Sequence, residues 1–123
     1  MLRGVRGATG VEANTREAIL GATRELLQKM AEANAIEPDR VSMILFTATT
    51  DLTAAFPATA AREIGWTRVP LMCSPELDVQ GALPRIVRVM ILVETELSPQ
   101  AIRHQYLSRA AALRPDLAAE GKR

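Results

Sequence analysis

Charged residues interrupt an apolar stretch in the second half of the chain, and they are the first candidates for chemistry. Residues 86–93 are aliphatic at every position except Arg88, a pattern typical of a strand covered on both faces. A guanidinium buried there requires a carboxylate or an anionic ligand, because an unpaired buried charge is strongly destabilising. Glu76 precedes this strand and is one candidate partner. The pair indicates either an anion site or a buried ion pair without chemistry, and these two residues alone do not decide between them.

Arg6 is a second arginine that could face an anion. It lies between Gly4 and Gly7 in a predicted strand over residues 2–8, where glycines indicate a close approach to the backbone. An exposed arginine on an edge strand is the better prediction from sequence alone.

Few other side chains are suited to catalysis. Cys73 and His104 are the only residues of their types, and they form no recognisable nucleophile–base arrangement or nucleotide-binding loop. His104 is predicted to lie on the surface, since it has no spacing partner for a metal site. The remaining arginines, carboxylate, thiol and tyrosine suit a dianion site that works by positioning and electrostatics without a nucleophile.

Composition narrows the functional classes. The 123 residues predict a single domain, and 15 basic against 14 acidic residues argue against a nucleic-acid or anionic-membrane surface. One cysteine allows no internal disulfide and favours the cytoplasm. No signal peptide or membrane span is predicted.

The first half of the chain contains a strand, a long helix and a second strand. Asn14 is predicted to cap a helix that runs to about residue 33 with an apolar stripe at helical spacing. A loop over 34–40 leads to a strand over 41–48 that is apolar on both faces and is therefore predicted to be central and covered. A short helix over 57–64 follows, and Gly65 closes it. Phe56 and Arg62 next to or on this helix are predicted to be a core-edge aromatic and a solvated arginine.

The second half adds two strands and an ambiguous end. Strands are predicted over 69–73 and 86–93, separated by a break at Ser74-Pro75, and Ser98 is predicted to cap a helix that Pro99 begins. Residues 102–107 fit either a helix or a short strand. The ordered domain is expected to span 1–117, with 118–123 as a flexible C-terminal tail.

These elements predict an α+β fold, a mixed sheet with one long and one short helix on one face. A single long helix cannot easily cover such a sheet. Met43 and Met90 would then be buried by other subunits, so a closed oligomer is expected.

The sequence also resembles a known family over nearly its whole length. The segments that carry the resemblance, in the family's order and spacing, are RGVRGAT (3–9), ATTDL (48–52), FPA (56–58), CSPELDV (73–79), IVRVM (86–90), IRHQYL (102–107) and LRPDL (113–117). They are similar to the monofunctional chorismate mutases of the trimeric α/β class, which are unrelated in fold to the all-helical chorismate mutases.

This resemblance implies a homotrimeric pseudo-α/β barrel with active sites between subunits. It implies a Claisen rearrangement of chorismate to prephenate, toward tyrosine and phenylalanine, without cofactor, metal or covalent intermediate. It also implies that Arg88 faces the breaking ether bond, Glu76 meets the ring hydroxyl, and Arg6 binds a carboxylate. The further substrate-binding residues it implies are Tyr106, Cys73, Phe56, Arg62, Met72, Thr59, Leu113 and Arg114. It favours a strand around Tyr106.

Two positions depart from the commoner family pattern. Thr59 stands where lysine is frequent, which removes a positive charge from the mouth of the cleft, and Met72 stands where threonine is frequent. There are two alternative functions: a trimeric protein on a similar fold that binds small molecules or processes imines, and a non-catalytic regulatory subunit that binds a metabolite of the aromatic pathway. Arg6, Glu76, Arg88 and Tyr106 together argue against both, because a binding protein needs no cation at a breaking bond.

Overall fold

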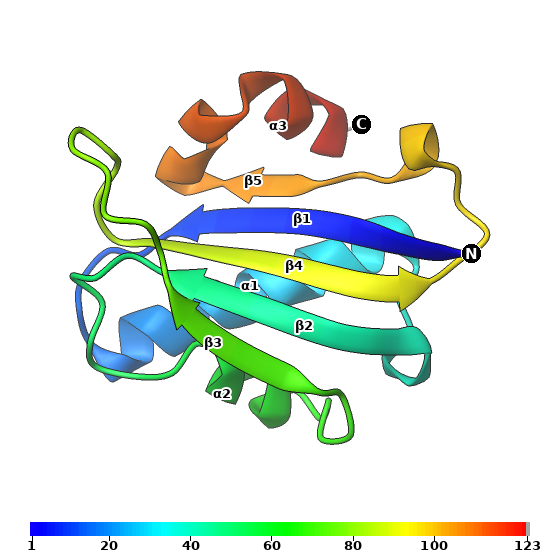
Figure 1. Cartoon of the computed structure of the whole chain (residues 1–123), viewed down its shortest axis with the longest axis horizontal. Helices are drawn as coiled ribbons and strands as arrows, with labels where there is room; N and C mark the ends of the chain where they lie inside the picture. The colour runs from blue at the N-terminus through cyan, green and yellow to red at the C-terminus, as the bar shows by residue number, and fades with distance from the viewer. Residues whose placement is uncertain (123) are drawn as a thin grey trace.

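The computed structural model describes residues 1–122 as one mixed sheet with helices on one face and along one edge (Figure 1). Its elements in chain order are β1 (Leu2–Gly10), α1 (Arg16–Asn34), the 3-10 helix η1 (Pro38–Arg40), β2 (Val41–Ala48), α2 (Ala58–Glu63), β3 (Leu71–Pro75), β4 (Ile86–Glu94), η2 (Pro99–Ala101), β5 (Gln105–Leu107), η3 (Ser108–Leu113) and α3 (Pro115–Gly121). The five strands lie in the order β3-β2-β4-β1-β5. The expected α+β class is thus confirmed. No helix within residues 1–122 is both long and apolar enough to cross a membrane.

Helices α1 and α2 lie behind the sheet in Figure 1 and cover one of its faces. The apolar stripe of α1 is buried there, and its members are Ile19, Leu20, Thr23, Leu26, Leu27 and Met30. Gly7 permits the contact, because a Cβ at this position would clash with Met30 Sδ. The close approach expected beside Arg6 is therefore real, and it is made by α1.

The cap of α1 differs from the prediction. Thr15 is the N-cap and accepts a hydrogen bond from the Ala18 N–H at 3.1 Å. Asn14 instead accepts from the backbone N–H groups of Thr53 and Ala54, at 2.9 and 3.0 Å. A tertiary contact has taken the side chain that was expected to cap the helix.

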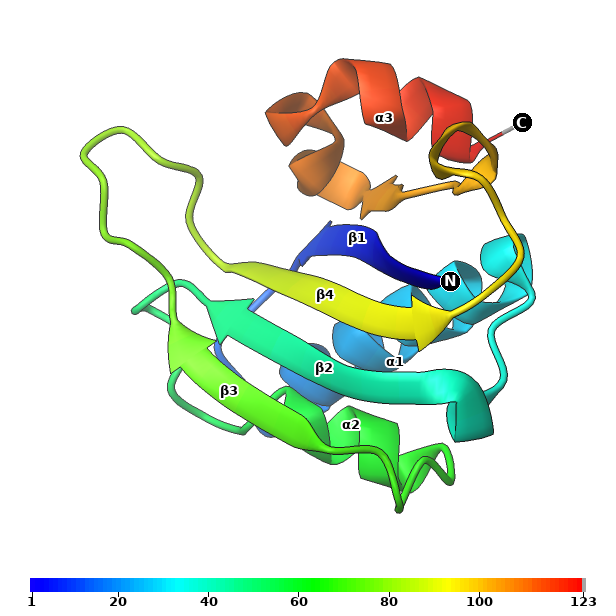
Figure 2. The same cartoon turned by 45° about the vertical axis from the view of Figure 1, so that its right-hand side comes forward.

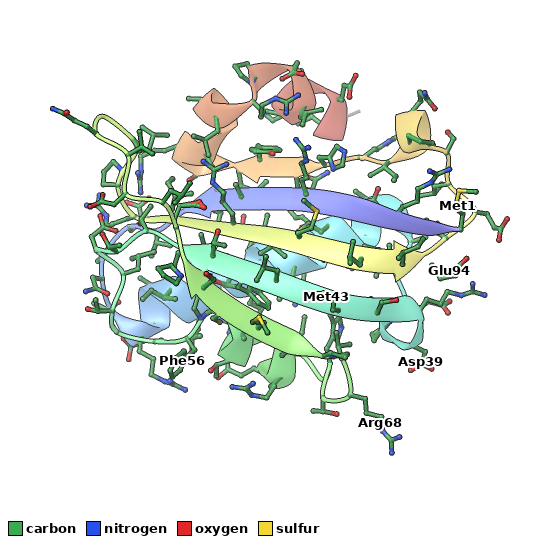
Figure 3. The ribbon with its side chains drawn as sticks, in the orientation of Figure 1. Met1, Asp39, Met43, Phe56, Arg68 and Glu94 are labelled. Carbon is green, nitrogen blue, oxygen red and sulfur yellow. The ribbon has the colours of Figure 1, made fainter. Side chains whose placement is uncertain are left out.

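The other face of the sheet is open within the single chain. On β4, Val87, Val89 and Ile91 are buried toward the helices, whereas the Arg88 side chain between them is 45% exposed. Met43, Leu45, Met90 and Leu92 on the open face are only partly buried, and Figure 3 labels Met43 among the open-face side chains. The expectation that β2 and β4 are covered on both sides is thus wrong for one chain, because its helices all lie elsewhere.

Two smaller elements also differ from the prediction. β3 begins at Leu71 and continues through Pro75, so the expected break at Ser74-Pro75 is wrong. A proline is tolerated because β3 is an edge strand that pairs only with β2. Ser98 caps η2, a single 3-10 turn, by accepting from the Ala101 N–H.

The C-terminal segment packs along the β5 edge. Residues 105–107 form a strand parallel to β1, which decides between the two interpretations of this stretch. Helix α3 runs across the expected boundary at residue 117, and its Ala118 is buried with Tyr106 and Ala8. The stretch expected to be a tail is therefore helical as far as Gly121, and Arg123 lies outside the described residues.

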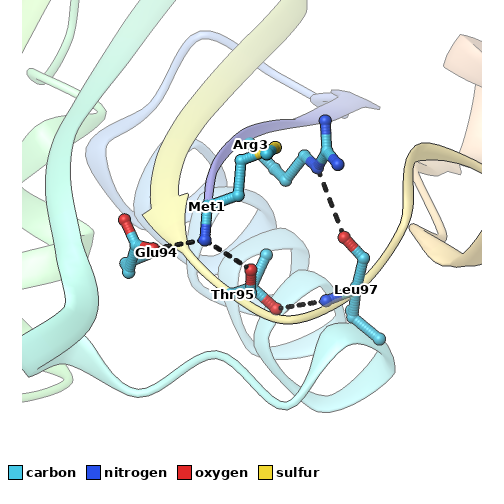
Figure 4. Close-up of polar contacts among 5 residues, drawn as sticks. All are labelled: Met1, Arg3, Glu94, Thr95 and Leu97. Atoms are coloured by element: carbon cyan, nitrogen blue, oxygen red, sulfur yellow. Dashed lines mark hydrogen bonds and ion pairs between the residues drawn. The ribbon is translucent and has the colours of Figure 1, made fainter.

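Polar contacts hold the start of β1 against the end of β4 (Figure 4). The Met1 ammonium contacts the Glu94 carboxylate and donates to the Thr95 carbonyl at 3.1 Å. Arg3 Nε donates to the Leu97 carbonyl at 3.3 Å. These contacts fix the β1–β4 register that places Ala8 opposite Arg88.

Candidate active site

A cavity of about 320 Å³ opens on the uncovered sheet face. Its lining residues are Arg6, Gly7, Leu45, Thr47, Glu76, Arg88, Val89, Met90 and Tyr106. Four of these, Arg6, Glu76, Arg88 and Tyr106, are predicted site residues from four different parts of the chain. The structure brings them together, and their convergence defines the candidate active site.

Strand register explains how the site is assembled. Thr47 on β2 and Ala8 on β1 both pair with Arg88, and Tyr106 on β5 pairs with Ala8. The four residues form one row across the sheet, on one face, because paired residues share a face. Arg6 lies one step along β1 from Ala8 on the same face. Within the row, the small Ala8 side chain lies between Arg88 and Tyr106.

Glu76 is held at the site from two sides. Arg88 Nε lies 3.1 Å from Glu76 Oε2, and the Thr47 hydroxyl donates to Glu76 Oε1 at 2.9 Å. The Glu76 backbone N–H donates to the Ala48 carbonyl at 2.8 Å. Among residues 1–122, Glu76 is the ion-pair partner of Arg88, and Nε is the nitrogen that makes this contact.

The Arg88–Glu76 pair is present but not buried. With 45% of the Arg88 side chain and 20% of the Glu76 side chain exposed, the pair borders solvent in the single chain. The interpretation as a buried structural pair is therefore wrong for one chain. Arg6 is exposed as predicted, but β1 is an interior strand between β4 and β5, so Arg6 points from the open face and not from an edge.

Two predicted residues lie on β3, where Met72 pairs with the cavity residue Leu45 and Cys73 pairs with the buried Phe46. Cys73 is a free, exposed thiol, and Met72 on the open face is 62% exposed. Neither lines the cavity within one chain.

The predicted residues around α2 lie away from the cavity. Arg62 Nη2 donates to the Thr59 hydroxyl at 3.2 Å, and the Phe56 side chain is 71% exposed. The expectation that Phe56 packs at the core edge is wrong in the single chain. The structure therefore does not bring Phe56, Thr59 or Arg62 to the site of their own chain.

The two C-terminal predictions are close to Tyr106 but outside the cavity lining. Leu113 packs against the small cluster that contains Ala8 and Tyr106. Arg114 pairs with Asp116 at 3.1 Å, and this hydrogen bond raises the pKa of Arg114 and lowers that of Asp116.

Thr47 and His104 are the residues that sequence reasoning missed. His104 is half-buried at the surface, and its Nδ1 accepts a hydrogen bond from the Arg6 backbone N–H at 2.8 Å, a contact that its prediction as a surface residue did not include. Burial and then the nearby Arg6 lower its pKa below the ordinary value. No local sequence signal identifies either residue, because both contacts depend on strands that are distant in sequence.

Side chains that could bind a metal ion do not form a cluster within residues 1–122. Across residues 1–122, no three His, Cys, Asp or Glu side chains come together as a set that could hold a metal ion.

Comparison with known proteins decides the family. A family model described as chorismate mutase type I matches residues 2–117. The chain belongs to this family. It is 53% identical over 118 residues to chorismate mutase AroH of Thermus thermophilus, covering 95% of this chain and 97% of that protein. It is 49% identical over 118 residues to chorismate mutase AroH of Bacillus subtilis (strain 168), covering 95% and 93%.

A solved structure supports the same assignment at the level of the fold. A chorismate mutase from Clostridium thermocellum superposes with a TM-score of 0.88 at 47% identity, covering 89% of this chain and 98% of the other. The resemblance drawn from the sequence is thus confirmed, and the enzyme class of a type I chorismate mutase is isomerase. These matches indicate a chorismate mutase. They do not indicate either alternative, the protein that binds small molecules or processes imines, or the regulatory subunit.

Proposed function

We propose that this type I chorismate mutase binds chorismate in the open-face cavity and rearranges it to prephenate for tyrosine and phenylalanine synthesis. The observation that carries the proposal is the convergence of Arg6, Arg88, Glu76 and Tyr106 on one cavity of about 320 Å³. Two cations face a substrate that is a dianion. The same cations explain why a protein of net charge +1 can still bind it.

Arg88 is the proposed catalytic cation. During a Claisen rearrangement the C–O bond breaks ahead of C–C bond formation, so negative charge builds on the ether oxygen. A guanidinium held there by Glu76 stabilises the transition state more than the ground state. The bonds break and form within one molecule, so the reaction requires no nucleophile, and the exposed Cys73 is assigned none.

The other cavity residues orient the substrate. Glu76 is proposed to accept a hydrogen bond from the ring hydroxyl, together with the backbone near Cys73, while Arg6 and Tyr106 bind a carboxylate of the pyruvyl arm. Holding both ends of the arm over the ring restrains the molecule in a reactive conformation, which lowers the entropic part of the barrier. No cofactor is assigned to the reaction.

We infer that the active form is a homotrimer in which each cavity is completed by a neighbouring subunit. Large apolar side chains support an assembly, since Phe56, Met72, Leu77 and Val79 are 71%, 62%, 84% and 61% exposed in one chain. The long segment between β3 and β4 that carries the last two projects from the body of the molecule (Figure 2). In the trimer Phe56, Thr59 and Arg62 would reach the neighbour's cavity, and Leu113 and Arg114 would close its mouth.

Two departures from the commoner family pattern bear on substrate capture. Thr59 supplies no charge where lysine is frequent, so capture of the dianion is assigned to Arg62, with Met72 adding apolar contact. The expected location is the cytoplasm.

Arg88→Ala tests the proposed chemistry. Loss of a preorganised charge donor typically costs about 3 kcal/mol, so turnover of chorismate to prephenate should fall roughly a hundredfold or more. Arg88→Lys should recover little, because a flexible ammonium is more strongly hydrated and differently placed. Chorismate loss and prephenate formation are followed with purified protein whose oligomeric state matches the unsubstituted chain. Near-normal kcat in either variant contradicts the assignment.

A further inference from the structure

His104 joins the two strands that carry Arg6 and Tyr106. The parallel ladder between β1 and β5 contains three pairs and begins at Gly7–Gln105. Just before that first pair, the Arg6 backbone N–H donates to Nδ1 of His104 at 2.8 Å. A side-chain nitrogen therefore accepts where a longer ladder would supply a backbone carbonyl. This bond extends a three-residue strand that is short for independent pairing.

The same end of β5 is held from its other side by Asn34. This side chain is buried at 4% exposure, and its Oδ1 accepts from the Arg103 N–H at 2.7 Å. Its Nδ2 donates to the Arg103 carbonyl at 3.0 Å and to the Met30 carbonyl at 2.9 Å. Residue 103 is thus anchored to α1 and residue 104 to β1. Of the two side chains that hold this segment, Asn34 and His104, only His104 contacts a residue that lines the cavity, namely Arg6.

The His104 imidazole can accept the hydrogen bond from the Arg6 N–H in only one protonation state and one tautomer. Nδ1 is an acceptor when it carries no proton, so the neutral form with the proton on Nε2 is required. The lowered pKa of His104, caused first by burial and then by Arg6, agrees with a neutral ring.

We propose that His104 is a positioning residue, which fixes the Arg6 backbone against β5 so that the Arg6 and Tyr106 side chains meet the same substrate carboxylate. This inference rests on the proposed function of the cavity. The proposed effect of His104 on substrate binding is indirect, because its Nδ1 already accepts a hydrogen bond from the Arg6 N–H. A small displacement of β5 along β1 would separate two groups that have to bind one carboxylate together, and substrate affinity would fall.

Asparagine and glutamine provide a matched pair of substitutions. Asn Oδ1 can occupy the position of Nδ1 and accept the Arg6 N–H, whereas the Gln amide reaches the position of Nε2 and leaves that N–H without its acceptor. His104→Asn should keep kcat/KM within about twofold of the unsubstituted enzyme. His104→Gln should lower it by about tenfold, mainly through KM, because carboxylate binding contributes to ground state and transition state alike.

A double substitution separates positioning from general stability. If His104 acts through Arg6, His104→Gln should add less than about a twofold loss in an Arg6→Ala background. Equal KM for His104→Gln and the unsubstituted enzyme, or a full tenfold loss on top of Arg6→Ala, overturns the inference while chorismate turnover stands.

Nuclear magnetic resonance of the unsubstituted protein tests the geometry even where a variant does not fold. The chain has one histidine, so its ¹⁵N imidazole signals need no assignment. At about pH 7.5 they should show a neutral ring with Nε2 protonated. A proton on Nδ1 overturns the inference. Should the protein not convert chorismate, the proposed function fails, and this spectrum still reports the His104 contact separately.

Discussion

At the scale of single residues, the candidate site contains side chains that hold a proposed catalytic group as well as the proposed groups themselves. Glu76 is oriented by Arg88 on one oxygen and by the Thr47 hydroxyl on the other. Thr47 pairs with Arg88 across the sheet, so one β-strand row supplies both contacts. A carboxylate fixed at both oxygens presents a defined edge to a substrate hydroxyl.

Thr47→Val removes the hydroxyl and keeps the shape of the side chain. Glu76 then loses one of its two contacts and should rotate more freely, so kcat/KM should fall about fivefold to tenfold. Thr47→Ser keeps the donor and serves as the matched control, with activity within about twofold of the unsubstituted enzyme. Steady-state kinetics of the two variants measure the difference. A valine variant as active as the serine variant would remove Thr47 from the site.

At the scale of elements, packing of α1 against β1 fixes the strand that carries Arg6. Gly7 faces the fully buried Met30 and Leu26 of α1, whereas Arg6 faces the open side. The glycine thus sets how closely the helix approaches the sheet beneath the cavity.

Gly7→Ala should destabilise the fold by about 1–3 kcal/mol, because the added methyl group has no space between the strand and Met30. Gly21→Ala in α1 is the matched control. Its Cβ would meet only Arg24 Nη2 at 3.9 Å, so it should be neutral or stabilising by up to about 1 kcal/mol through helix propensity. Urea unfolding at one protein concentration measures both. Equal midpoints for the two variants contradict the tight contact.

The free energy of unfolding should depend on pH through His104, which joins the start of β5 to β1. Its folded pKa is lowered from 6.5 by burial, then by Arg6 and, less strongly, Arg114, while Glu120 acts in the opposite direction. As pH falls below 6.5 the unfolded chain therefore binds a proton that the folded chain does not, and stability is lost. This contribution is complete above 6.5 and declines toward the lower folded pKa.

Thermal unfolding of the unsubstituted protein and His104→Asn, compared between about pH 7.5 and 5, isolates this effect. The asparagine variant should show the smaller loss toward acid. Asp51 and Asp116, whose pKa values are lowered from 3.8 by hydrogen bonds from Thr49 and Arg114 respectively, act at lower pH. Parallel curves for the two proteins would show that His104 is not the group responsible.

At the scale of the whole molecule, the open sheet face and the distant α2 residues lead to the same proposal. The cavity lies on the face that no helix within residues 1–122 covers, and Arg62 belongs to α2, which lies behind the sheet. A site shared between two chains accounts for the open sheet face and for the distance of Arg62 from the cavity of its own chain.

Co-refolding of two variants with reduced activity tests the shared site. Arg62→Glu should be weak, because a carboxylate at the mouth repels the dianion, and Arg88→Ala should be nearly inactive. In a closed ring assembled at random from equal amounts, about a quarter of the sites pair an intact Arg62 with an intact Arg88, so activity should rise above the mean of the parents. Mass spectrometry of intact complexes confirms mixed trimers. Mixed trimers no more active than that mean would place each site within one chain.

The sequence alone determined the long helix, the first four strands and the family, because apolar periodicity and motif order are properties of the chain itself. Residues Arg6, Glu76, Arg88 and Tyr106 could be named before any fold was known, and the structure places all four in one cavity. Only the tertiary structure decided that β2 and β4 are open on one side, since an apolar run does not indicate which molecule covers its second face. It also decided the strand at 105–107 and the hydrogen bonds of Thr47 and His104. Those depend on strand register, which pairs residues far apart in sequence through backbone hydrogen bonds that leave no local pattern.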